Sequence, residues 1–166
     1  MGISRSGKSA EESFRKITGA SKPSKSSIGD AILCGHAIEV KKASSNTINQ
    51  VRAVKWIPLV VRDDKHDEWY VIPAPDVVEL VSQKTRGQHT ENPFESATLS
   101  VAKIRSFRVE KSELKKSVLQ AVARGKKFSV LRKATEKVLS DSKKLAKVSK
   151  SEVAIALKRS RLTSRT

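Results

Sequence analysis

The chain has 166 residues, with 34 lysines and arginines against 17 aspartates and glutamates, and therefore a formal net charge of +17. A single cysteine rules out an internal disulfide framework, and one cysteine with three scattered histidines disfavours a structural zinc site. No apolar run reaches the roughly 18 residues of a membrane span, and the polar, basic first residues do not have the pattern of a signal peptide. Such a charge favours a polyphosphate partner over a basic one.

The first predicted element is a helix from Ser9 to Gly19, preceded by residues 1–8, which we expect to be disordered. Ser9 and Glu12 have the spacing of a capping box, and glycine commonly follows the last turn of a helix. Apolar residues at helical spacing predict its buried stripe, which is Ala10, Phe14 and Ile17. Glu11 lies beside that stripe by helical angle, whereas Glu12 points away.

The next stretch predicts a β-hairpin around which the rest of the chain is organised. Its strands cover residues 30–34 and 37–41, with a tight turn at Gly35-His36, where glycine can adopt a positive φ. A turn at this place pairs residues whose numbers sum to about 71. This register decides which side chains of the two strands face each other.

Two carboxylates and one lysine meet at one end of this hairpin. Asp30 is predicted to face Lys41 and to lie one pair from Glu39, and Glu39 and Lys41 share a face because side chains alternate along a strand. Mg²⁺ is commonly held by one or two carboxylates together with phosphate oxygens, and a neighbouring lysine can orient a water or offset phosphate charge. The alternative is a surface salt bridge worth at most about 1 kcal/mol.

The residues Asp30…Glu39-Val40-Lys41 resemble the PD-(D/E)XK nuclease superfamily, with Gly29 in place of the proline. The resemblance implies Mg²⁺-dependent hydrolysis of DNA phosphodiester bonds, with Mn²⁺ as a possible substitute and no small-molecule cofactor. It also implies an α/β fold with a restriction-endonuclease-like core, in which helices flank a mixed central sheet. Asp30, Glu39 and the Val40 carbonyl would hold the ion, and Lys41 would position the attacking water.

The resemblance covers roughly residues 9–72 and adds two supporting catalytic residues. Gln50, on a helix predicted over residues 47–55, looks like the glutamine or lysine that supports the site in relatives. Glu11 looks like an acidic residue that several relatives place near the metal from the helix before the hairpin. Each has an ordinary alternative, because Gln50 can be an exposed helix residue and Glu11 can simply favour the positive end of its helix.

The middle of the chain predicts two strands and a helix. A continuous apolar run, residues 56–62, predicts a buried central strand that Pro58 interrupts near its start, and residues 68–72 predict the next strand. A helix then begins at Asp76 and is closed by Gly87. The turn between the strands is interpreted as solvated and not as a metal cluster, although it holds Asp63, Asp64, His66 and Asp67.

Polar side chains after this helix are candidates for contact with DNA. The loop over residues 85–96 carries types that can read base edges, although it can equally be a surface connection. The spacing after it favours a helix with Pro93 at its first position, and the alternation over residues 98–101 leaves a strand possible. The candidate DNA-binding residues are Lys42, Arg52, Arg86, Gln88, His89 and Asn92.

The last third of the chain holds most of the positive charge. Residues 105–166 contain 19 lysines and arginines against five acids. Apolar stripes predict helices, one of them ended by Gly125 and another with Leu131, Val138 and Leu145 at spacings of seven, typical of a helix–helix seam. We interpret this segment as a basic helical extension for DNA binding or dimerisation, with a merely solvated face as the alternative. The predicted domains are thus residues 1–8, a nuclease core over 9–104, and an extension over 105–166.

These features predict a site-specific DNA endonuclease of restriction or homing type that acts on double-stranded DNA. Because cutting two strands takes two sites, we expect a homodimer or a higher homo-oligomer. One alternative is a structure-selective nuclease resembling a Holliday-junction resolvase, which reads shape and phosphates more than bases. Another is a non-catalytic basic DNA-binding protein. The expected location is the cytoplasm, in a prokaryotic or phage context, with no membrane partner.

Overall fold

The computed structural model describes residues 5–128 and 132–133. The strands are β1 Ala31–Leu33, β2 His36–Lys42, β3 Thr47–Val51, β4 Leu59–Asp63, β5 Glu68–Ile72, β6 Ala97–Ser100 and β7 Arg108–Val109. The α-helices are α1 Arg5–Thr18, α2 Ala74–Ser82, α3 Val101–Ile104 and α4 Leu114–Lys127. Three short 3₁₀ turns are η1 Ala53–Lys55, η2 Arg105–Phe107 and η3 Lys111–Glu113.

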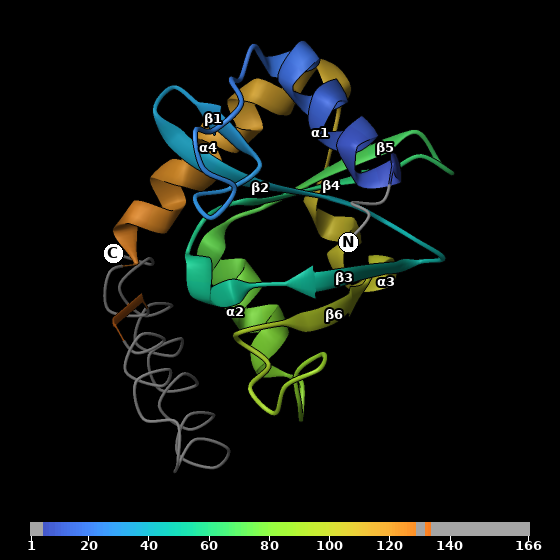
Figure 1. The fold of residues 1–166 in the computed structure, drawn as a ribbon, viewed down its shortest axis with the longest axis vertical. Coiled ribbons are helices and arrows are strands. Elements are labelled where there is room, and N and C mark those ends of the chain that lie inside the picture. The colour runs from blue at the N-terminus through green and yellow to red at the C-terminus, as the bar shows by residue number, and fades with distance from the viewer. Residues whose placement is uncertain (1–4, 129–131, 134–166) are drawn as a thin grey trace.

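Five strands form a mixed sheet in the order β1-β2-β4-β5-β7, and β3 and β6 form a separate antiparallel pair (Figure 1). Strands β2 and β4 are parallel, whereas the other neighbours in the large sheet are antiparallel. The predicted α/β class with a mixed sheet and helices is confirmed. None of the helices in the described ranges is both long enough and apolar enough to span a bilayer.

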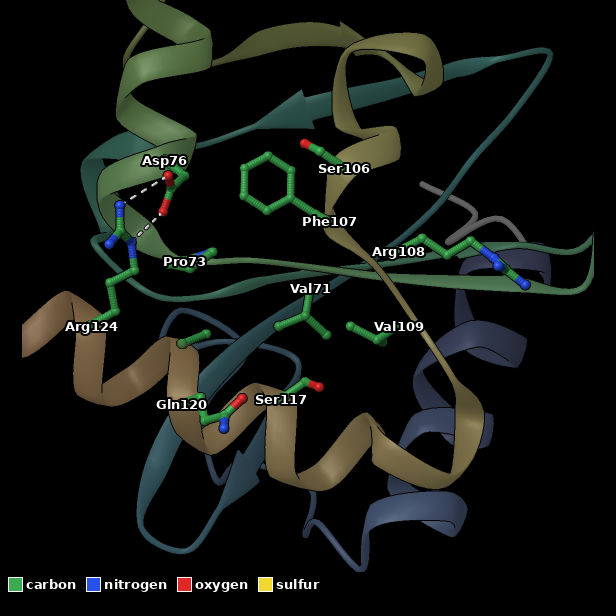
Figure 2. Close-up of a pocket in the computed structure, with 11 residues that line it drawn as sticks. Val71, Pro73, Asp76, Ser106, Phe107, Arg108, Val109, Ser117, Gln120 and Arg124 are labelled. Atoms are coloured by element: carbon green, nitrogen blue, oxygen red, sulfur yellow. Dashed lines mark hydrogen bonds and ion pairs between the residues drawn. The ribbon is translucent and has the colours of Figure 1, made fainter.

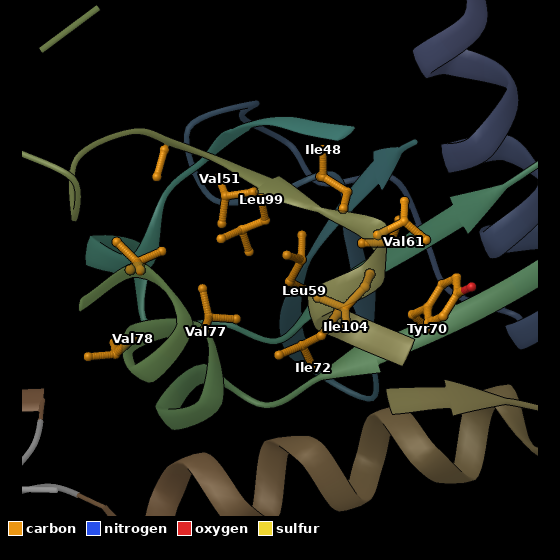
Figure 3. Packing of buried hydrophobic residues seen from close by; sticks show 14 of the residues in the cluster. Ile48, Val51, Leu59, Val61, Tyr70, Ile72, Val77, Val78, Leu99 and Ile104 are labelled. Carbon is orange, nitrogen blue, oxygen red and sulfur yellow. The ribbon is translucent and has the colours of Figure 1, made fainter. Parts of the chain in front are cut away.

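Each face of the large sheet is buried under a different layer. Helices α1 and α4 cover one face, where Phe14 and Leu114 pack on residues such as Val60. Helix α2 and the β3–β6 pair cover the other, where Leu59 and Val61 lie among the buried hydrophobic residues (Figure 3). Burial on both sides explains the continuous apolar run in β4, and the predicted central strand is confirmed.

The residues after position 104 contribute to this same core. Strand β7 pairs with β5, and α4 buries Leu114 and Val118 against the sheet. The Arg124 guanidinium reaches across to Asp76 of α2 at 2.8 and 3.3 Å, beside a cavity of about 360 Å³ (Figure 2). The packed core therefore continues through α4, beyond the boundary that composition indicated. The predicted seam of Leu131, Val138 and Leu145 lies outside the described residues.

The helix predicted over residues 47–55 is wrong. These residues form β3 and η1, because Ile48 and Val51 pair with Leu99 and Ala97 of β6 and are buried by that pairing. The partner strand β6 lies in the segment after Pro93, for which we favoured a helix and left a strand possible over residues 98–101. The structure forms the strand there. Local spacing could not reveal this pairing, since its two strands lie about fifty residues apart in the chain.

The ends of two other helices also differ from prediction. Helix α1 begins at Arg5, so residues 5–8 are helical and Ser9 lies inside the helix, not at its cap. Gly19, with a φ of +75°, directly follows its last turn as predicted. Helix α2 begins at Ala74, which places Asp76 in the first turn, and it ends at Ser82, well before Gly87.

Truncation of Leu114 tests whether α4 belongs to the core. Its side chain is fully buried, so Leu114→Ala should lower the free energy of unfolding by about 2–5 kcal/mol. Ile28→Ala is the control, because Ile28 is an exposed aliphatic residue and its loss should cost less than about 0.5 kcal/mol. Urea denaturation followed by circular dichroism measures both. Equal, small effects would show that α4 is an independent extension.

Candidate active site

The hairpin turn lies one residue earlier than predicted. Cys34 and Gly35 both have positive φ, +49° and +79°, as the two central residues of a type I′ turn require. Ala31 consequently pairs with Ile38, and Leu33 with His36. This register places Asp30 opposite Glu39, not opposite Lys41, and so brings the two carboxylates closer together than the predicted register would.

The parallel pairing of β2 with β4 sets the environment of these side chains. Glu39 pairs with Leu59 and Lys41 with Val61, so all four residues share one face of the sheet. This face is apolar on β4 and charged on β2. Glu39 is only 6% exposed, and its backbone N–H is bonded to the Pro58 carbonyl at 3.0 Å. The carboxylate is thus held rigidly at the border between the core and the sheet edge.

Two lysines neutralise Glu39. Lys41 Nζ lies 3.1 Å from Glu39 Oε1, and Lys55 Nζ lies 3.1 Å from Oε2. A buried carboxylate without a partner is costly, so this double pairing compensates for the burial of Glu39. Lys55 comes from η1, the short turn between β3 and β4. It is the site residue that the sequence interpretation did not select.

Asp30 is tied to the backbone of the strand that it faces. Its Oδ2 accepts a hydrogen bond of 2.9 Å from the Val40 N–H, and its own N–H donates to the Ile38 carbonyl. Burial raises the pKa of the Asp30 carboxyl, and the nearby Glu39 carboxylate raises it further. Two acids that repel each other in a partly buried site are therefore present at this end of β2.

The Val40 carbonyl faces the same side of β2 as Asp30. In an extended strand the N–H and C=O of one residue point to the same side, and neighbouring residues point to opposite sides. Because the Glu39 N–H bonds to the β4 side, the backbone groups of Val40 point the other way, where its N–H meets Asp30. Strand β1 begins only at Ala31, so Val40 lies at the open end of the β1–β2 ladder.

Glu11 of α1 also lies within electrostatic range of this site. Burial raises the pKa of its carboxyl, and the Asp30 carboxylate adds to that rise, while Arg15 and Lys41 oppose it. Its carboxylate forms an ion pair of 3.7 Å with Arg15, whose guanidinium also donates to the Asp30 carbonyl at 3.1 Å. Helix α1 is thereby fixed against the start of β1.

The donor set fits a hard divalent cation. Asp30, Glu39 and the Val40 carbonyl supply oxygen atoms, which are the ligands that Mg²⁺ prefers. Burial first, and neighbouring carboxylates second, raise the pKa of Asp30 and of Glu11, and a bound cation would oppose both effects. Mn²⁺ accepts the same oxygen ligands.

Gln50 is placed differently from its predicted role. It is exposed on β3 with a φ of +54°, and its backbone N–H donates to the Gln88 side chain at 2.7 Å. The described contacts of Glu39 and Asp30 do not include it. Asn92 likewise uses its side chain within the loop, by accepting from the Phe94 N–H at 3.0 Å. The amides of Gln88 and Asn92 thus stabilise the loop over residues 85–96.

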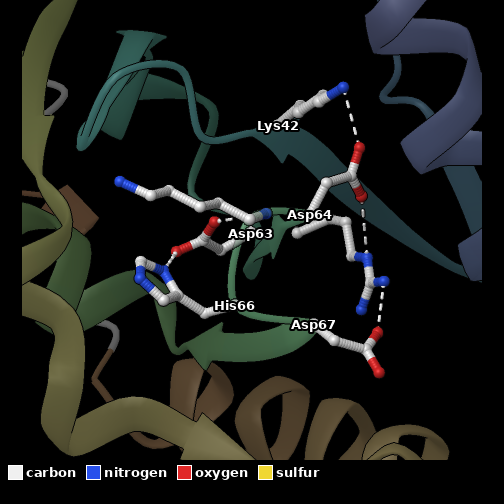
Figure 4. Close-up of polar contacts among 7 residues, drawn as sticks. Lys42, Asp63, Asp64, His66 and Asp67 are labelled. Atoms are coloured by element: carbon white, nitrogen blue, oxygen red, sulfur yellow. Dashed lines mark hydrogen bonds and ion pairs between the residues drawn. The ribbon is translucent and has the colours of Figure 1, made fainter.

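The other candidate DNA-binding residues differ in their surroundings. Lys42 forms an ion pair of 2.7 Å with Asp64 on the face opposite Lys41 (Figure 4). Arg52, Arg86 and His89 are exposed. These three remain accessible to a ligand from solvent.

The acidic turn between β4 and β5 divides into two groups (Figure 4). Asp64 and Asp67 both contact Arg62, so they do not converge with the others. Asp63 is buried and lies 2.7 Å from His66 Nδ1, and ligand atoms of Asp63, His66 and Glu68 lie within 4.8 Å of one another. Residues 64–67 are exposed, as predicted for a solvated turn, and only Asp63 is buried.

Comparison with models of known protein families finds no match for this chain. A comparison with curated proteins finds none either.

Replacement of Asp30 by asparagine tests the crowding of charge at the site. Because the pKa of Asp30 is raised in the folded protein, the folded state binds this proton more tightly than the unfolded chain does. Stability contributed by protonation is present at acidic pH and is lost as the pH rises through the folded-state pKa. Asp30→Asn should therefore raise the Tm of the metal-free protein near neutral pH, by about 2–4 °C for each 1 kcal/mol recovered.

Asp64→Asn is the matched control for this experiment. A hydrogen bond from Lys42 lowers the pKa of Asp64, so removal of its charge should leave the Tm unchanged or reduce it. Differential scanning calorimetry in EDTA measures both variants. A lower Tm for Asp30→Asn would contradict the charge crowding inferred here.

Proposed function

We propose that this protein is a Mg²⁺-dependent DNA endonuclease of the PD-(D/E)XK kind. The proposal rests mainly on one observation, the buried Glu39 held between Lys41 and Lys55 and facing the carboxyl of Asp30. Carboxylates and lysines in this arrangement serve phosphodiester hydrolysis better than they serve stability, since buried ion pairs rarely stabilise more than apolar residues do. The net charge of +17 supports a polyphosphate substrate.

Asp30, Glu39 and the Val40 carbonyl would hold the ion. When bound, Mg²⁺ supplies Lewis-acid stabilisation of the phosphate and lowers the pKa of a coordinated water. The hydrogen bond from the Val40 N–H to Oδ2 fixes the orientation of the Asp30 carboxylate. The other carboxylate oxygen would therefore already point toward the ion before it binds. Glu11 would add a further carboxylate at the border of the site.

Lys41 is the residue that we expect to act on the reacting groups. Its side chain is about one quarter exposed, so it is accessible to a substrate, and its ammonium is oriented by Glu39. There it can donate to the attacking water and stabilise the negative charge that develops on the phosphate oxygens. Lys55 acts through Glu39 by fixing the second carboxylate oxygen, and it is therefore a positioning residue.

The substrate class within this function has two candidates. A site-specific enzyme of restriction or homing type, acting as a homodimer on double-stranded DNA, remains the first. A specific observation favours a structure-selective, resolvase-like enzyme as the second. Gln88 and Asn92, which could read bases, instead stabilise their own loop, while exposed Arg86 and Arg52 suit phosphate contact.

Substitution of Lys41 tests the catalytic proposal. Lys41→Ala should reduce the rate of DNA cleavage at saturating DNA by about 100-fold or more, with binding retained. Lys42→Ala is the matched control, because the adjacent lysine points to the opposite face and pairs with Asp64. Plasmid and four-way junction substrates are incubated with Mg²⁺ or EDTA and resolved on gels.

Discrete plasmid fragments would identify a site-specific enzyme, and cleavage of the junction alone would identify a resolvase. Cleavage that continues in EDTA would exclude the metal-dependent mechanism. Binding without cleavage in the unaltered protein would leave a non-catalytic DNA-binding protein.

A comparison of Lys55→Ala with Gln50→Ala decides which residue supports the site. Removal of Lys55 takes a competing cation from Glu39, so the Mg²⁺ concentration for half-maximal activity should fall while the maximal rate decreases about 10-fold or more. Gln50→Ala should change neither quantity, because Gln50 is exposed and contacts Gln88. Opposite behaviour of the two variants would restore the role inferred from the sequence.

A further inference from the structure

A second basic site lies at the far end of the β4–β5 hairpin. A cavity of about 600 Å³ opens there between the hairpin, the β2–β3 turn and the segment that carries α3, η2 and β7. Three basic side chains line it, against a single acidic one. They are Lys65, Arg105 and Arg108, and the acid is Glu68.

The acids near the floor of this cavity already have partners. Asp63 accepts from the Lys65 backbone N–H at 3.1 Å and contacts His66, while Glu68 accepts from the Tyr70 hydroxyl and pairs with Arg108 at 3.1 Å. Burial, followed by the hydrogen bond to Glu68, raises the pKa of Tyr70 to about 12, so its hydroxyl remains a donor. The acidic oxygens are thus satisfied from within the protein.

Two of the basic side chains at the rim of the cavity have no ion-pair partner among the described residues. Among the described residues, neither the Lys65 ammonium nor the Arg105 guanidinium lies within ion-pair distance of a carboxylate. Both are exposed, and Ser100 and Asn46 add side-chain hydrogen-bond donors to the same lining. The cavity therefore presents a surplus of positive charge and donors, which favours an anion over a metal ion.

We propose that this cavity binds a phosphate group of the nucleic-acid backbone. The proposal rests on the nucleic-acid binding in the proposed function, but not on cleavage. Lysine and arginine together with hydroxyl and amide donors form most protein contacts to DNA phosphates. A planar guanidinium such as that of Arg105 can bind two phosphate oxygens at once.

The position of the cavity suits a ligand that also reaches Glu39 and Lys41. Asp63 lies two residues beyond Val61, the partner of Lys41, and on the same face of the sheet. Two residues of a strand span roughly 7 Å, and the strands themselves are about 5 Å apart. These spacings are within the roughly 12 Å width of a DNA major groove, so one duplex can contact both sites.

The test measures the salt dependence of DNA binding for the double variant Lys65→Ala/Arg105→Ala. Affinity for a fluorescent duplex is titrated in EDTA at several salt concentrations, so cleavage plays no part. Loss of one phosphate contact should reduce the slope of log K against log salt by about 0.9. The matched control is Lys103→Ala/Lys115→Ala, which removes two exposed charges outside the cavity lining and should leave the slope unchanged.

Small ligands identify the source of the phosphate and the competing cation. A rise in Tm with inorganic phosphate, in the unaltered protein but not in the double variant, would support a phosphate site that also accepts the free ion. An unchanged slope in the double variant would overturn the proposal. So would a rise in Tm with Mn²⁺ or Zn²⁺ that His66→Ala abolishes, because the cavity would then be a cation site.

The outcomes for the two sites are separable. A protein that binds DNA with the expected change of slope but never cleaves it would refute the nuclease and keep the phosphate cavity. A protein that cleaves DNA normally, with a slope unaffected by the double variant, would refute the cavity alone.

Discussion

The candidate site depends on Glu39, which is buried and shared by two lysines. Lys41 comes from the same strand, whereas Lys55 comes from a turn sixteen residues along the sequence from Glu39. The carboxylate therefore links β2 to η1, and its burial requires that both ammonium groups stay in place. An arrangement in which two lysines pair with one buried carboxylate contributes little to stability compared with an apolar core. The arrangement holds charge in a fixed geometry, which is what the proposed catalysis would require.

One face of the sheet changes from apolar on β4 to charged on β2, and this change sets how deeply the charged side chains are buried. Leu59 and Val61 of β4 face the core, while Glu39 and Lys41, their partners on β2, stand on the same face at the border of that core. The same acids on β4, the central strand, would be buried completely, whereas on an edge strand they would be exposed to water. The short β1 completes the position, since it begins only at Ala31 and leaves Asp30 and the backbone of Val40 beside each other.

The sequence analysis located the two carboxylates and the lysine of the candidate site better than it located the residues that contact them. Alternation along one strand was enough to place Glu39 and Lys41 on one face, and the hairpin brought Asp30 to the same end. The register was wrong by one residue because Cys34 adopts a positive φ, which few residues other than glycine, asparagine and aspartate do readily. Lys55 was not selected, because its position depends on β3 pairing with β6. That pairing is distant in the chain and overrides the local helical spacing, so the predicted helix on which the resemblance placed Gln50 does not form.

Charge is distributed over this protein in a way that relates the two proposed sites. Around Asp30, burial and then the neighbouring carboxylates raise the pKa of two carboxyls, those of Asp30 and Glu11, despite a net charge of +17. Around Arg105 the acids are paired with other side chains of the protein, and the side chains left without an ion-pair partner among the described residues are cations. The basic cavity attracts a nucleic-acid backbone, whereas the acids around Asp30 and Glu39 are balanced by Lys41, Lys55 and Arg15. A divalent cation at Asp30 and Glu39 would add positive charge there, so the proposed DNA substrate and metal ion should bind cooperatively, with the basic cavity providing affinity that does not depend on the metal.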